Sequence, residues 1–158
     1  LLAELGVKPE RNLFLSINYD GNFEENQGWA ALGATASVQG RMRRYVESQP
    51  AFAQASLAQA VELALCTWAV GSLAQAASES TAAESSSTQL SEEQTEGDGS
   101  SLPDKAALLA HVRQTVAEKS LECVLLERRG PGSAKYRALR PEELGRLLPS
   151  AVSAPATT

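Results

Sequence analysis

Residues 13–35, LFLSINYDGNFEENQGWAALGAT, decide the fold that this sequence predicts. Apolar and polar side chains alternate over residues 13–19, which is the two-residue period of a β-strand with one face better buried. Asp20-Gly21 then favours a turn, and the polar residues after it predict a short irregular tip. The apolar run 29–35 is expected to return as the second strand of a covered sheet. The side chains expected on the buried face of the first strand are Leu13, Leu15, Ile17 and Tyr19.

Two helices are expected directly after this hairpin. The first carries one apolar stripe at helical spacing, made of Val38, Met42, Tyr45 and Val46, and ends at Gln49-Pro50. Ser56 and Gln59 predict a capping box, in which each side chain satisfies a backbone amide of the other residue. The helix that follows, to residue 76, is apolar on nearly every side. It must therefore be buried on nearly every side, inside a layered domain or against another chain.

Three arginines of the first helix, Arg41, Arg43 and Arg44, have three interpretations. The simplest is a solvated helix face, and the sharper one is a contact surface for a neighbouring subunit. Phosphate binding is a third, but no glycine-rich loop lies beside them.

The second half of the chain begins with an acidic segment. Residues 77–101 hold six acids, no Lys or Arg, one Leu and no aromatic residue, so they offer too little apolar surface to offset chain entropy. We assign residues 77–102 to an acidic disordered insert. Residues 103–149 then predict a helix opened by Pro103-Asp104, a hairpin over 121–139 and a last helix opened by Pro141.

The hairpin over 121–139 includes an apolar run, Cys123 to Leu126, that suits a strand buried on both faces. Residues 150–158 are expected to be a disordered tail. Helices gathered between antiparallel hairpins indicate an α+β layered fold. The chain opens on a strand-like apolar pattern at Leu1, which we interpret as the cut end of a longer protein.

Composition excludes several classes of function. The formal net charge is −5 for 158 residues, and the six acids of the insert account for it, so we expect no nucleic-acid partner. The longest apolar stretch, 63–74, is shorter than the roughly 20 residues of a membrane span, and we expect no membrane partner.

Cys66 and Cys123 lie among apolar neighbours, which indicates two buried thiols in a reducing cytoplasm. His111 is the only histidine and is expected at a surface or boundary, so we predict no catalytic, cofactor-binding or metal-binding residues.

The order of these motifs resembles the α-type subunits of bacterial proteasomes. The first hairpin is similar to that family's pattern LYRITYDGS…GFVAMGG, and residues 3–6, AELG, match the AEVG strand before it. The long helix is similar to SLxEALxLAVxAL, and the second hairpin to the closing LEVAVLD…RAFRRI. The stretches that carry the likeness are 3–6, 13–21, 28–33, 56–64, 121–126 and 136–139.

The resemblance implies a proteasome-type αββα sandwich, like that of N-terminal-nucleophile hydrolases, from which the N-terminal half is missing. Residues 1–76 and 103–149 would belong to one α-type domain of a 20S core particle. Such subunits form a seven-membered outer ring on β-type catalytic subunits, gate the passage of substrates and dock a regulatory ATPase in the cytoplasm. The family's gating and activator-pocket residues precede Leu1, so no functional residue is carried over.

Two other functions remain open from the sequence. The first is a catalytic β-type relative, a threonine protease whose N-terminal hydroxyl is the nucleophile and whose free amine is the base. Neither Leu1 nor its neighbours can supply that chemistry. The second is a stand-alone binding domain without ring assembly. The long acidic insert and the extra helix after it are departures from the family pattern, although insertions at surface loops are compatible with an unchanged core.

Overall fold

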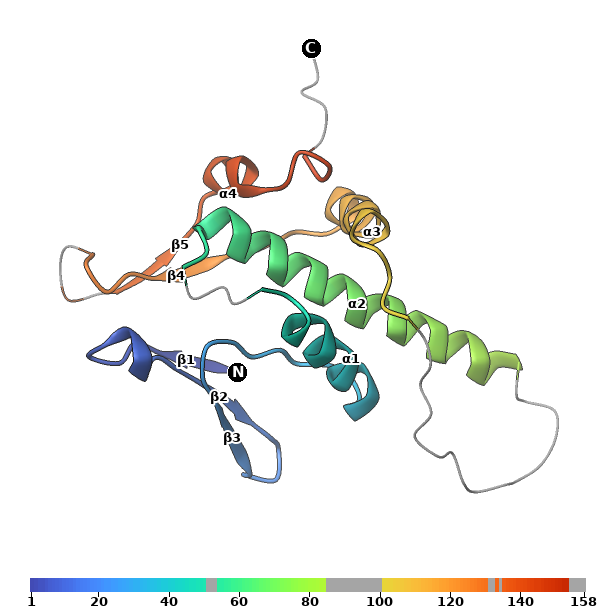
Figure 1. The fold of residues 1–158 in the computed structure, drawn as a ribbon, viewed down its shortest axis with the longest axis horizontal. Coiled ribbons are helices and arrows are strands. Elements are labelled where there is room, and N and C mark those ends of the chain that lie inside the picture. The colour runs from blue at the N-terminus through green and yellow to red at the C-terminus, as the bar shows by residue number, and fades with distance from the viewer. Residues whose placement is uncertain (51–53, 85–100, 131–132, 134, 154–158) are drawn as a thin grey trace, which may run out of the picture.

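The computed structural model describes residues 1–50, 54–84, 101–130, 133 and 135–153. Helices and two small antiparallel sheets alternate along the chain (Figure 1). The elements, in chain order, are β1 Leu2–Glu4, the 3-10 helix η1 Pro9–Arg11, β2 Leu13–Ile17, β3 Phe23–Asn26, α1 Ala36–Glu47, α2 Leu57–Glu84, α3 Lys105–Glu118, β4 Val124–Leu126, β5 Tyr136–Ala138 and α4 Pro141–Leu147.

The first sheet has the order β1-β2-β3, with both pairs antiparallel. Its hairpin turns earlier than the sequence indicates. The backbone N–H of Asn18 donates to Asn22 O at 2.8 Å, the Asp20 carboxylate accepts from the Asn22 backbone N–H at 3.0 Å, and Gly21 has φ +86°. This compact turn lets the strand resume at Phe23. The prediction of a strand over residues 29–35 is therefore wrong.

The covered face of β2 also differs from the prediction. Ile17 is 54% exposed and Tyr19 is fully exposed, whereas Ser16, on the opposite face, is 7% exposed. Cross-strand partners lie on the same face of a sheet. Leu2 pairs with Leu15 and Ile17 pairs with Phe23, so all four side chains lie on one face of the first sheet. Of the four side chains expected on the buried face, Leu13 and Leu15 are half-buried and Ile17 and Tyr19 are exposed, so this face is covered only in part.

The second sheet is the hairpin of β4 and β5, in which Leu125 lies opposite Arg137. Two further backbone bonds extend the pairing, from Leu139 N–H to Cys123 O at 2.8 Å and from Glu127 N–H to Lys135 O at 2.7 Å. The predicted hairpin over 121–139 is thus confirmed, with shorter strands. Burial on both faces is not, since Val124 is 45% exposed.

Helix α2 organises the hydrophobic core. It lies between α1 on one side and α3 and α4 on the other (Figure 1). The expected α1 stripe is buried, and α2 begins at the predicted capping box: the Ser56 N–H donates to Gln59 Oε1 at 2.8 Å and the Gln59 N–H to Ser56 Oγ at 3.3 Å. The core side chains are Tyr45, Val61, Leu65, Cys66, Ala69, Val70, Leu108, Leu109, Val112, Leu144 and Val152.

Two predicted boundaries of disorder need correction. Helix α2 continues to Glu84 instead of ending at residue 76, because Ala and Glu are strong helix formers and the Gln75 side-chain amide donates to Glu79 Oε1 at 3.0 Å. Residues 85–100 of the predicted insert lie outside the described residues. The expected tail from residue 150 includes Val152, which is 3% exposed in the core, while 154–158 lie outside the described residues.

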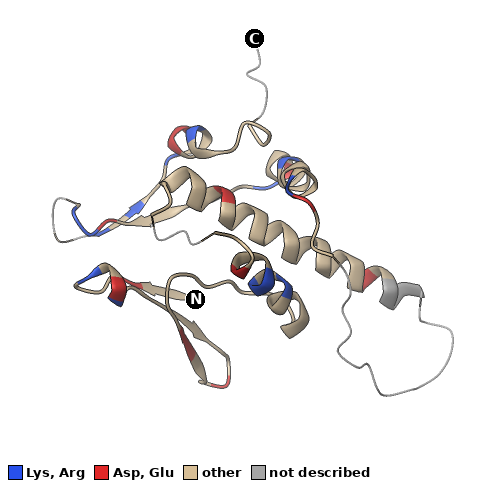
Figure 2. Ribbon diagram, viewed as in Figure 1, with Lys and Arg blue, Asp and Glu red and all other residues tan. Residues whose placement is uncertain are grey.

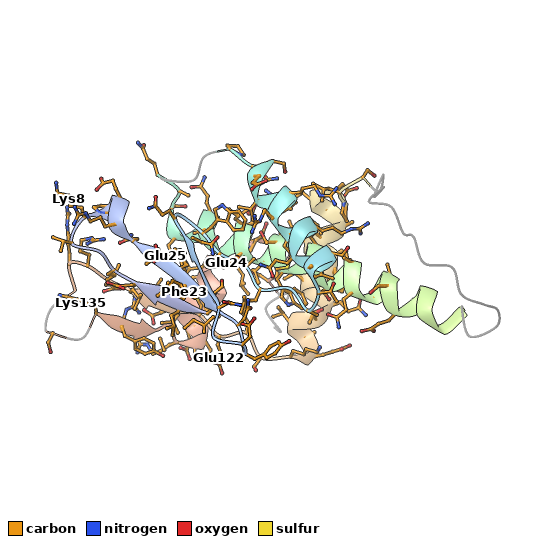
Figure 3. The ribbon with its side chains drawn as sticks, turned by 90° about the horizontal axis from the view of Figure 1, so that it is seen from below. Lys8, Phe23, Glu24, Glu25, Glu122 and Lys135 are labelled. Atoms are coloured by element: carbon orange, nitrogen blue, oxygen red, sulfur yellow. The ribbon has the colours of Figure 1, made fainter. Side chains whose placement is uncertain are left out.

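The two sheets lie one over the other at the same end of the molecule in both views (Figures 1 and 3). The Arg128 guanidinium connects them, because it donates to the backbone oxygen of Gly6 and to the side-chain oxygen of Asn12. Within the described ranges the sheets share no strand pairing.

Candidate functional site

The single histidine has a structural role between two helices. The His111 ring on α3 stacks on Trp68 of α2, with ring centroids 5.6 Å apart and an interplanar angle of 14°, and His111 Nε2 lies 3.0 Å from Ser72 Oγ. His111 is half-buried, so its predicted boundary position is confirmed. Among the residues that the structure describes, no three His, Cys, Asp or Glu side chains are grouped to hold a metal ion.

Cys66 is held as a neutral thiol beneath an ion pair. It is 1% exposed and lies beside Tyr45, and Glu62 above it pairs with Lys105. Burial raises the pKa of the Cys66 thiol, and burial also raises the pKa of the Tyr45 hydroxyl. A thiol with a raised pKa is a poor nucleophile at neutral pH, so this pair stabilises the core and does not suit covalent chemistry.

The prediction of two buried thiols holds for Cys66 but not for Cys123. Both cysteines are free, as expected, but Cys123 is only half-buried at the start of the second hairpin. Leu121, Cys123 and Leu139 pack against the helical core, so this face of the hairpin is covered.

The opposite faces of the two sheets expose large apolar side chains. Leu2, Ile17 and Phe23 on the first sheet are 56%, 54% and 62% exposed, and Val124 and Tyr136 on the second are 45% and 64% exposed. We call these five side chains the open sheet faces. Large apolar side chains that lie next to each other in the open, as the cross-strand partners Ile17 and Phe23 do, mark interaction surfaces. The sequence pattern located β2 and the second hairpin, but it could not show which face of each sheet has no covering layer.

A separate apolar groove lies beside the helices, on the side of the second hairpin that packs against the core. It has a volume of about 430 Å³ and lies between α2, α3 and the segment before β4. Trp68, 39% exposed, lines it, and Lys119 and Glu122 supply its charges. Leu57, Ala64 and Trp68 of α2 are exposed, so the helix is not buried on nearly every side within this chain. Burial of this line against another chain, the other expectation, stays a prediction.

The α1 arginines lie where a helix face meets solvent. Arg43 and Arg44 are exposed and Arg41 is half-buried. Arg41 and Arg44 line a hollow of about 200 Å³ together with α2 and residues 101–103. This placement agrees with a solvated face and with a contact surface, the first two interpretations of these residues.

Helix α2 also meets a simple criterion for a membrane-crossing helix. Residues Leu57–Ser80 include an 18-residue window with a mean hydropathy of 1.4, and 39% of that window is buried inside the structure. Core helices of soluble proteins satisfy the same criterion of length and composition, so it is weak support for a membrane location.

Comparison of the chain with protein-family models, curated proteins and solved structures finds no match.

Proposed function

We propose that this chain belongs to a non-catalytic, α-type subunit of a proteasome-like ring. In this role it assembles with like subunits and with catalytic β-type subunits in the cytoplasm. The ring gates the passage of substrates and docks a regulatory ATPase. The order of the motifs supports this assignment, and the structure adds a physical reason for assembly.

The open sheet faces carry the proposal. The large apolar side chains of both sheets are each more than one third exposed, so they leave apolar surface area in water. Each Å² of that area raises the free energy by roughly 25 cal/mol relative to a buried state. Further strands and neighbouring subunits would cover that area. A ring built from layered subunits supplies both, whereas a small monomer supplies neither.

The chemistry of the described residues favours a structural role. Cys66 is sequestered as a neutral thiol, and His111 is engaged by Trp68 and Ser72. Each of these groups stabilises contacts between helices. The expected contribution of the chain is therefore shape and contact surface, not a reacting group.

Native mass spectrometry and size-exclusion chromatography of the full-length protein test the proposal. At micromolar concentration we expect a high-mass ring, alone or after co-expression with a β-type subunit. A monodisperse monomer under both conditions would contradict it. Peptidase activity of the purified full-length protein alone would favour the catalytic β-type alternative.

A paired substitution links the ring to the open sheet faces. Ile17→Ser with Phe23→Ser should reduce the high-mass species, because the two residues are cross-strand partners on the exposed face. Val7→Ser is the matched control, since Val7 is 89% exposed and lies outside the strands. Circular dichroism of each variant separates loss of assembly from loss of fold.

A further inference from the structure

The β1–β2 loop and the β4–β5 turn bring basic side chains together at one end of the molecule. Figure 2 shows Lys and Arg gathered at the left, in the η1 loop and at the β4–β5 turn, and Figure 3 places Lys8 and Lys135 at this same end. We call this surface the basic end. Its members are Lys8, Arg11, Arg128, Arg129 and Lys135.

Local hydrogen bonds hold the described residues of both loops of the basic end. In the first loop, the backbone N–H of Arg11 donates to Lys8 O at 3.0 Å. In the second, the Gly130 N–H donates to Glu127 O at 3.2 Å, and Lys135 Nζ donates to Gly130 O at 2.9 Å. Arg128 joins the loops through two neutral oxygen acceptors, so its own positive charge is retained.

The charge balance of this end opposes that of the whole chain. Lys8, Arg11 and Arg129 are exposed. Glu127 forms an ion pair with Arg137 at 3.0 Å, which leaves Glu10 as the acid without an ion pair among the described residues of these two loops. The formal charge of the chain is −5, so the count over the sequence conceals a local excess of positive charge.

We propose that the basic end docks a short acidic run of a partner polypeptide. The cations spread over two loops instead of converging on a pocket, which suits carboxylates spaced along a chain better than a single phosphate. A long polyanion such as nucleic acid would extend past the basic end onto parts of the described chain in which bases do not outnumber acids. A short acidic run places its charge only where the cations are.

Fluorescence anisotropy of a labelled oligoglutamate peptide with the full-length protein tests the proposal. We expect binding that weakens as salt is added. The triple variant Lys8→Gln, Arg11→Gln, Arg129→Gln should weaken binding about tenfold, since each exposed charge contributes a fraction of a kcal/mol. Arg128 stays unchanged in this variant because it holds the two loops together.

The matched control is Arg113→Gln, Lys119→Gln, Arg146→Gln, which removes the same residue types from exposed positions on α3, its C-cap and α4. It should retain wild-type affinity. Equal weakening in both triple variants would show an effect of net charge and would overturn the proposal, as would absence of peptide binding by the wild type. Tighter binding of a labelled single-stranded oligonucleotide than of the peptide would overturn the choice of partner. None of these outcomes depends on ring assembly.

Discussion

Gly71 sets how closely the first two helices approach. A Cβ atom at this position of α2 would lie 2.7 Å from Met42 Sδ and 3.1 Å from Met42 Cγ, and Met42 is 6% exposed on α1. Any side chain here must displace a buried thioether in a tightly packed contact. Gly40 of α1 is the contrasting case, since its added Cβ would meet no atom within 4 Å.

These two glycines predict opposite effects of the same substitution. Gly71→Ala should lower the free energy of unfolding by about 1–3 kcal/mol, because overpacking forces a shift in the core. Gly40→Ala should raise it by about 0.5–1 kcal/mol, because alanine is the better helix former. Urea denaturation of both variants measures the difference, and equal effects at the two positions would refute the packing argument.

The Cys66 thiol predicts a loss of stability in mild alkali. Its folded-state pKa is raised by burial, so the unfolded chain releases the thiol proton first as pH rises above about 8.5. The free energy of unfolding should then fall as pH rises further, by at most about 1.4 kcal/mol per pH unit. Cys66→Ser should flatten this decline in urea titrations, whereas Cys123→Ser should retain it. If the free energy of unfolding of Cys66→Ser still falls with rising pH in the same way, another titrating group causes the decline.

Helix starts are encoded locally in three elements. The Thr35 side chain accepts from Val38 N–H at 3.3 Å at the start of α1, and Asp104 accepts from Ala107 N–H at 2.7 Å at the start of α3. At α2, Ser56 and Gln59 satisfy each other's amides. Such caps stabilise helices whatever packs against them.

Removing the α2 cap should therefore cost stability without a change in the core. Ser56→Ala is expected to lower the free energy of unfolding by about 1 kcal/mol. Ser120→Ala, at an exposed position outside the helices, should change it by less than about 0.5 kcal/mol. Thermal unfolding followed by circular dichroism compares the two, and a neutral Ser56→Ala variant would show that α2 is fixed by tertiary packing alone.

The helix starts could be predicted from the sequence because their signals are short-range, and the second hairpin could be predicted because its alternation frames a turn. The end of α2 could not be predicted, because the polar composition of residues 77–84 indicates disorder whereas their Ala and Glu residues favour a helix. The apolar run 29–35 suggested a strand, but the turn at Asp20-Gly21 completes the hairpin before it. The open sheet faces depend on which face other layers cover, which periodicity does not specify.

At the scale of the whole molecule, Arg128 is the side chain that bridges the two sheets. Replacing it with Met, which keeps an unbranched apolar stem but has no donors, should release the Gly6–Asn12 loop. Hydrogen–deuterium exchange is expected to increase in residues 6–12, with little change in the helical core. Arg129→Met is the control, because Arg129 is exposed and outside this contact. Unchanged exchange in residues 6–12 of Arg128→Met would show that backbone bonds alone hold the loop.

The bridge made by Arg128 also bears on how the chain folds. Its contact with Gly6 joins residues 122 positions apart, whereas most other contacts within the core link elements closer in sequence. Closing this loop costs more chain entropy than closing the shorter connections between α1, α2 and α3, so these helices are expected to assemble first and the amino-terminal sheet to dock last. In a chaperone-limited cell, the interval before that docking is when this protein is most vulnerable to proteolysis and to strand exchange between nascent chains.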